Sequence, residues 1–455
     1  MRTKVRIKYT SFIGIGVIFV LALNSADAQV VTGRIGTSIY NWERQDSPLV
    51  STMHLRFYQL ANFKVTGLTG NRLSIHTGIA YSTDLSNAAS NDPRTRIVNL
   101  HLKYKAPHGV LLYAGRQRIY SNSVTVAFDG IRLKYKAIPN LILTGYWGAN
   151  VPADRGLEVR DIRENQVLGF QSSYRNFFGS DISIAYSDVR REPVQYSTLG
   201  VITGKILQKQ STQERFLSGG IRKKFGNNVD IRTRLLLNYG LPLVGSGTHG
   251  FRRFQRFELT GNYKPGKDIT IKAKYIIRRP RLNENSIFWV FNQKPNTEIG
   301  SRVYYHVNKD ISMSAGIAVI MFEQTEDFET LDRINITINS GIRWKGSSLG
   351  LTRRRGYAGD ALSINISNSS KLSDVFKLRI GSSYSTYKID PEAITDNSST
   401  TAFIGGDIRF SNSIWTGVDL QYLSQNIKSQ SDFYGYSSDY RFFVRINYRF
   451  RTKIR

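Results

Sequence analysis

Basic side chains at alternate positions of short apolar segments are the clearest chemical feature of this sequence. In residues 440–450, apolar and polar side chains alternate along the chain. The apolar set is Phe442, Val444, Ile446, Tyr448 and Phe450, and the polar set is Arg441, Arg445, Asn447 and Arg449. Successive side chains of a β-strand point to opposite faces, so this segment has one apolar face and one cationic face. A water-facing row of arginine and lysine attracts anions, as it does in anion-selective pores.

Ten basic residues in similar segments are candidates for lining such a pore. They are Arg116, Arg118, Arg132, Lys134, Arg232, Arg234, Lys272, Lys274, Arg333 and Arg379. If the pore is a barrel in a membrane, turning one of these strands over would place its arginine and lysine side chains in the hydrocarbon of the bilayer. Each such side chain would destabilise the barrel by about 2–4 kcal/mol near the bilayer midplane. A second interpretation stays open, in which the bases only neutralise acids across a narrow or plugged interior. The inward acids would then include Glu258, Asp407 and Asp419.

Alternation also predicts which side chains face lipid. In residues 111–120 we expect the outward set to lie opposite Arg116 and Arg118. That set is Leu111, Tyr113, Gly115, Gln117 and Ile119. In the next segment, Ile131, Leu133 and Tyr135 are expected to face outward, opposite Arg132 and Lys134. A strand with an apolar outside and a polar inside is typical of a closed transmembrane barrel.

The elements that would position these residues are antiparallel strands joined by alternately short and long connections. We predict an all-β transmembrane barrel of about 22 strands, within a range of about 16 to 22. Short turns, such as residues 69–71 and 264–267, contain Gly, Asn or Pro, and would face the periplasm. Polar stretches near 83–95, 149–164, 191–213, 240–251, 278–296, 323–330, 388–400 and 427–438 would be extracellular loops.

The first 28 residues predict a cleavable signal peptide. Four basic residues precede an apolar run from Phe12 to Leu23, and Ala26-Asp27-Ala28 offers a small-residue cleavage site. The run is shorter than the roughly 20 residues of a spanning helix. We therefore expect residues 29–455 to form a single barrel domain in the outer membrane of a two-membrane bacterium, in contact with lipid and lipopolysaccharide. The sequence leaves a monomer and a homotrimer open.

Charge and composition narrow the function further. The chain contains 63 Lys and Arg against 34 Asp and Glu, a formal net charge of +29, and this charge is spread through the strands. A nucleic-acid module would gather it on one arm or helix, so no nucleic-acid partner is expected. There is no cysteine, and the six histidines lack metal-motif spacing, so we expect no metal and no cofactor. His249 beside Ser246 is the best hydrolase candidate, but the segment is more simply a flexible loop, and we expect no enzyme.

Two short segments resemble a known family. They are Leu112-Tyr113-Ala114-Gly115-Arg116-Gln117-Arg118-Ile119 and Phe128-Asp129-Gly130-Ile131-Arg132-Leu133. They are similar to the Gly-Arg-Gln and Asp-Gly hairpin of outer-membrane porins, including the phosphate-selective and alginate-export types. The resemblance covers about 25 residues and implies a transport barrel with arginine-rich lumen strands and a constricting loop folded inside.

These features together predict a porin for passive diffusion of small anionic solutes. Export of an anionic polysaccharide is one alternative, and it would require a wide lumen. A closed barrel acting as a membrane enzyme or surface adhesin is another, and it would not conduct ions.

Overall fold

The structure of the chain is a computed structural model. It describes residues 29–47, 50–89, 92–152, 154–191, 212–239, 254–279, 295–322, 334–356, 359–388, 397–427 and 435–454. The predicted signal peptide, residues 1–28, lies outside these ranges and stays a prediction. Arg333 and the segment around His249 also lie outside them. No helix among the described residues is long and apolar enough to cross a membrane.

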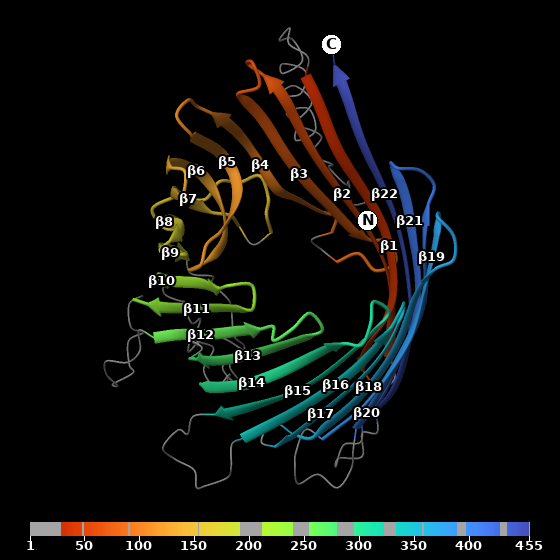
Figure 1. Ribbon diagram of the computed structural model, residues 1–455. Helices are drawn as coiled ribbons and strands as arrows, with labels where there is room; N and C mark the ends of the chain where they lie inside the picture. Colours follow the sequence, from red (N-terminus) through yellow and green to blue (C-terminus); the bar gives the residue numbers. More distant parts are fainter. Residues whose placement is uncertain are drawn as a thin grey trace, which may run out of the picture.

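Twenty-two strands form one closed ring (Figure 1). They are β1 (Gln29–Ser47), β2 (Val50–Leu68), β3 (Leu73–Asp84), β4 (Arg94–Lys105), β5 (Val110–Tyr120), β6 (Thr125–Ile138), β7 (Leu141–Asn150), β8 (Gln166–Phe177), β9 (Ser180–Arg191), β10 (Thr212–Phe225), β11 (Val229–Asn238), β12 (Phe254–Tyr263), β13 (Ile269–Arg278), β14 (Asn296–His306), β15 (Ile311–Phe322), β16 (Ile334–Trp344), β17 (Ser347–Gly356), β18 (Ala361–Lys371), β19 (Phe376–Tyr387), β20 (Asn397–Arg409), β21 (Ile414–Ile427) and β22 (Gly435–Ile454). The predicted all-β antiparallel barrel and its strand number are confirmed.

Antiparallel pairing of the first and last strands closes the ring. The pairing runs from Gln29 opposite Ile454 to Asn41 opposite Phe442. The start of β1 also lies opposite the end of β2, with Val30 facing Thr66. The first residue of β1 and the last residue of β22 therefore lie at the end of the barrel that carries the short turns. Closure pairs the two outermost strands with each other, and lipid requires such pairing because it offers no hydrogen-bond partner.

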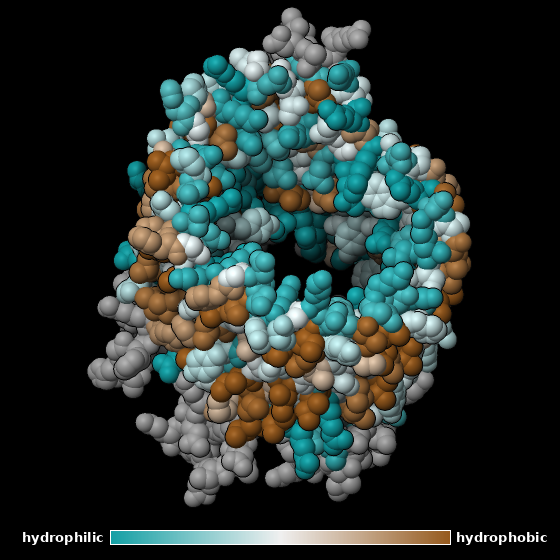
Figure 2. Space-filling view, viewed as in Figure 1, coloured by the Kyte–Doolittle hydropathy of each residue, from teal (hydrophilic) through white to brown (hydrophobic). Residues whose placement is uncertain are grey.

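Hydrophobic side chains cover the outer face of the wall. Ile131, Ile338 and Ile446, on three widely separated strands, are each about half exposed, at 49%, 54% and 49%. Figure 2 shows brown, hydrophobic residues around the outside and teal, hydrophilic residues around a central opening that passes through the molecule. An apolar exterior around a polar interior is the arrangement of an outer-membrane barrel.

The predicted facing of residues 111–120 is wrong by one position. Leu112 pairs with the exposed Leu133, whereas Tyr113 pairs with Arg132 and Lys103 on the lumen face. The guanidinium carbon of Arg132 lies 3.9 Å from the centroid of the Tyr113 ring. Tyr113 therefore belongs to the inner wall. The cause is a change of direction of β5 at Gly115, described next.

Candidate channel constriction

The β5–β6 hairpin leaves the barrel wall partway along its length. β4 begins at Arg94 and β5 extends to Tyr120, but the two strands pair only from Lys105 opposite Leu111 to Leu100 opposite Arg116. β5 and β6 stay paired to the hairpin end, where Tyr120 faces Thr125. The end of the hairpin therefore separates from β4 as an intact two-stranded unit that turns toward the lumen (Figure 1).

Three glycines form the crease at which the hairpin turns. Gly115, Gly130 and Gly148 lie opposite one another across β5, β6 and β7. Gly115 has a φ of 114°, a conformation that side chains disfavour. A Cβ atom at Gly115 would overlap the carbonyl oxygen of Leu100, and one at Gly148 would overlap that of Asp129. Only glycine permits the backbones to approach this closely.

The turned hairpin packs on the lumen face of β7, β8 and β9. Ile119, Val126 and Phe128 of the hairpin meet three side chains of the wall in one buried cluster. The wall residues are Tyr146, Val167 and Val189. Phe128, Val167 and Val189 have no exposed surface, which is unusual inside a polar lumen. Burying an apolar side chain of this size contributes about 1.5–3 kcal/mol, so the hairpin is held by a small core of its own.

Polar contacts fix the hairpin tip farther around the ring. The Oγ atoms of Ser123 and Ser187 lie 2.5 Å apart, and Ser187 Oγ lies 2.6 Å from the Tyr146 hydroxyl. Asn122 Nδ2 donates to Ser183 Oγ on β9, and Arg234 on β11 donates to the Asn122 carbonyl. The tip thus spans the inner face of the wall from β7 to β11 and narrows the lumen on that side.

Residues 151–152 and 154–165, between β7 and β8, pack where the hairpin has separated from β4. The amide of Ile97 on β4 donates to the Arg155 carbonyl at 2.9 Å, and the amide of Val151 donates to the Ala127 carbonyl at 3.1 Å. Arg116 joins this segment to the crease. Its guanidinium donates to the carbonyls of residues 155, 156 and 158, and it makes two 2.8 Å bonds to the carboxylate of Asp129.

Arg116 therefore differs from the water-facing cation expected from sequence. It is only 5% exposed, and Asp129 neutralises its charge. Arg118 lies two residues on, on the hairpin face opposite the buried Ile119, with its guanidinium 3.3 Å from the Tyr120 hydroxyl. The Gly-Arg-Gln and Asp-Gly residues thus build the crease: Gly115 pairs with Gly130, and Arg116 pairs with Asp129.

The other predicted lining residues in the described ranges differ in their ion-pair partners. Lys274 and Arg278 both bind the buried Glu298, and Arg379 binds Asp407 and Asp419. In the part of the chain that the structure describes, no ion pair is made by the remaining predicted cations. These are Arg118, Arg132, Lys134, Arg232, Arg234 and Lys272. Lys272 lies 4.8 Å from the Tyr304 ring centroid, in the manner of Arg132 on Tyr113.

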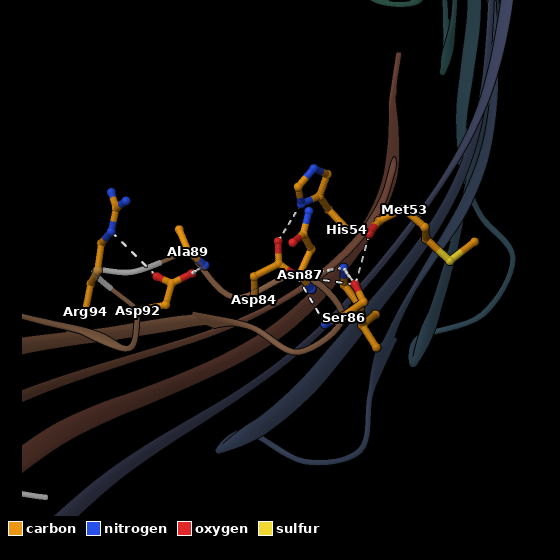
Figure 3. Close-up of polar contacts among 9 residues, drawn as sticks. Met53, His54, Asp84, Ser86, Asn87, Ala89, Asp92 and Arg94 are labelled. Atoms are coloured by element: carbon orange, nitrogen blue, oxygen red, sulfur yellow. Dashed lines mark hydrogen bonds and ion pairs between the residues drawn. The ribbon is translucent and has the colours of Figure 1, made fainter. Parts of the chain in front are cut away.

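A separate carboxylate network anchors the connection between β3 and β4 (Figure 3). Asp84 Oδ2 lies 2.6 Å from His54 Nδ1, and Asp84 Oδ1 accepts from the amides of Leu55, Ser86 and Asn87. Sequence reasoning gave no role to Asp84, because its partners come from another strand. The network holds the connection close to the wall, at the same end of the barrel as the hairpin tip.

Comparisons with known proteins give low similarity. No family model and no curated protein matches this chain. Among solved structures, Acinetobacter baumannii OccAB3 is 11% identical with a TM-score of 0.43, over 93% of this chain and 99% of that one. Acinetobacter baumannii OccAB2 is 10% identical with a TM-score of 0.45, over 92% and 98% of the two chains. The translocation pore of the P pilus usher PapC is 8% identical with a TM-score of 0.44, over 92% and 99%.

Similarities at these scores assign no function to the chain. The architecture follows from the closed strand pairing and the apolar exterior. It is that of an outer-membrane barrel of the porin type.

Proposed function

We propose that this chain is an outer-membrane porin through which small anionic solutes diffuse passively, and that the β5–β6 hairpin is its constriction. The observation that carries the proposal is the open, hydrophilic passage in Figure 2, narrowed from one side by a hairpin packed on the inner wall. Diffusion through such a passage requires neither ATP nor a cofactor, and no catalytic step is assigned to the chain.

Charge supports the anionic preference. Six of the ten predicted lining residues have no acid partner among the described residues, whereas Arg116, Lys274 and Arg379 are neutralised. An unpaired cation on a water-filled wall attracts anions, whereas a paired one contributes little field. The selective field would therefore come from Arg118, Arg132, Lys134, Arg232, Arg234 and Lys272.

Planar-bilayer recording of the refolded chain, residues 29–455, tests the proposal. We expect open single-channel steps and, under a potassium chloride gradient, a reversal potential that favours chloride. Arg232→Glu should shift that potential toward potassium, whereas Lys345→Glu, in the turn between β16 and β17, should shift it less.

Each outcome of the recording has a distinct meaning. An open channel that favours cations would keep the porin and overturn its anion preference. A folded barrel without conductance would overturn the porin and favour an enzyme or adhesin. A wide pore that passes long anionic oligosaccharides would favour the export channel.

A further inference from the structure

A group of basic side chains lies on the lumen face next to the glycine crease, on the side of the short turns. We call it the cationic patch, and it comprises Lys64, His76, His101, Lys103 and Arg132. Across the strands, His76 faces both Lys64 and His101, and Tyr113 faces both Lys103 and Arg132. His101 also faces Gly115 of the crease. The patch therefore comes from four strands, β2, β3, β4 and β6, and Tyr113 of β5 completes the surface directly beside the constriction.

Aromatic rings hold these side chains in place. The His76 and His101 rings stack with centroids 4.9 Å apart and an interplanar angle of 9°. The Arg132 guanidinium lies 3.9 Å from the Tyr113 centroid, and Lys103 Nζ lies 5.5 Å from it. Ordered cations lose less conformational entropy on binding an anion than free surface lysines do.

Among the described residues, no carboxylate forms an ion pair with the patch. The strands that bear it contain two acids, Asp84 and Asp129, in their described residues. Asp84 binds His54 at the other end of the barrel, and Asp129 binds Arg116. The three charged members of the patch, Lys64, Lys103 and Arg132, repel one another, so an anion among them would be stabilised.

Two nitrogens of the patch are buried without a hydrogen-bond partner. They are Nε of Arg132 and Nδ1 of His101. Leaving a buried polar group unsatisfied is costly, so such groups usually have a partner. The planar guanidinium of arginine binds a carboxylate or phosphate through two parallel bonds, and Tyr113 already fixes its orientation.

We propose that the cationic patch is a saturable binding site for small oxyanions, namely carboxylates or phosphate, centred on Arg132. This inference rests on the proposed porin function and adds to it a discrete site beside the constriction. After passing the hairpin, a permeating solute would bind at the cationic patch before it reaches the periplasmic end of the pore. Conduction through such a site rises with solute concentration and then saturates.

Bilayer conductance in potassium phosphate and in potassium succinate, each over a range of concentrations, tests the site. The wild-type current should saturate with at least one of these anions. Arg132→Gln should raise the half-saturating concentration at least about tenfold, the factor expected when a charged hydrogen-bond donor is lost. The control is Lys345→Gln, which removes a cation held 5.9 Å from the Trp344 ring centroid in the turn between β16 and β17, away from the patch, and should leave saturation unchanged.

Conductance in potassium chloride checks that each variant forms a pore. If Arg132→Gln does not fold, His101→Phe keeps a stacked ring, removes its nitrogens and should raise the half-saturating concentration. Saturation with one anion alone supports the site and identifies its ligand as carboxylate or phosphate.

Two results would overturn the site while keeping the porin. One is an open, anion-preferring channel whose current stays linear in both salts. The other is an equal effect of Arg132→Gln and Lys345→Gln. A folded barrel without conductance would overturn the porin as well.

Discussion

Arg116 and Asp129 face each other across β5 and β6 and form two 2.8 Å bonds at the point where the hairpin leaves the wall. The same guanidinium donates to three carbonyls of residues 155–158. The Arg116 side chain thus connects the glycine crease to residues 155–158, which pack beside it. The arginine that sequence suggests as an attractant for solutes instead holds the constriction together.

Breaking this ion pair should free the hairpin. In Asp129→Leu the buried Arg116 keeps its charge without a counterion, which costs about 3–5 kcal/mol. We expect a lower unfolding midpoint in urea and a larger single-channel conductance. The double variant Arg116→Met with Asp129→Leu should be less destabilised than Asp129→Leu alone, because no buried charge is left unpaired. Arg118→Gln is the control, and equal losses in all three variants would contradict the role of the pair.

Adding a methyl group to the crease should also displace the hairpin. Gly148→Ala places a Cβ atom against the carbonyl of Asp129, and such overpacking costs about 1–3 kcal/mol. Gly145→Ala is the matched control on the same strand, since no atom lies within 4 Å of a Cβ atom there. We expect Gly148→Ala to raise conductance and Gly145→Ala to leave it unchanged. Equal conductances would show that the crease does not set the pore size.

The absence of cysteine allows a direct test of where the hairpin tip lies. Ser123 and Ser187 have their Oγ atoms 2.5 Å apart, so Ser123→Cys with Ser187→Cys should form a disulfide on mild oxidation. Because the tip already packs there, oxidation should leave conductance unchanged. Ser123→Cys with Ser385→Cys, on β19 of the wall, is the control and should not crosslink within the barrel. A conductance that falls on oxidation would mean that the tip normally moves away from β9.

Much of the fold could be predicted from alternation and turn residues. The 22 strands and the outward faces of β6 and β22 could be predicted, because apolar side chains face lipid and charged ones avoid it. The facing of β5 failed for a physical reason. Alternation assumes that a strand stays in the wall, whereas β5 turns inward at Gly115, so Arg116 is enclosed although it shares a face with Leu112.

The ion pairs of the lumen could be predicted less well. Glu258, Asp407 and Asp419 are expected to neutralise nearby bases if the lumen is charge-balanced. Each of them forms an ion pair, since Arg256 binds Glu258 and Arg379 binds the two aspartates. The pairing of Lys274 with Glu298 depends on the register between β13 and β14, which the intervening loop hides in the sequence. In the sequence of a single strand, a base that is paired with a buried acid cannot be distinguished from a base that faces water alone.

Asp407, which lies between two lumen arginines, provides a test of which cations the solute senses. Asp407 binds Arg379 at 3.1 Å and Arg445 at 2.9 Å, so it offsets charge on both. Asp407→Asn removes one negative charge and leaves Arg445 without its carboxylate, whereas Arg379 keeps Asp419. Because an unpaired cation exerts more field on the lumen, the reversal potential should move further toward chloride.

The matched control is Asp374→Asn, since Asp374 is 97% exposed in the turn between β18 and β19. That variant removes the same charge outside the lumen, where salt screens it over about 10 Å at 0.1 M ionic strength. Its effect on reversal potential should therefore be smaller. If both variants shift the potential equally, selectivity depends on total charge near the mouth, and the pairing of individual lumen arginines does not control it.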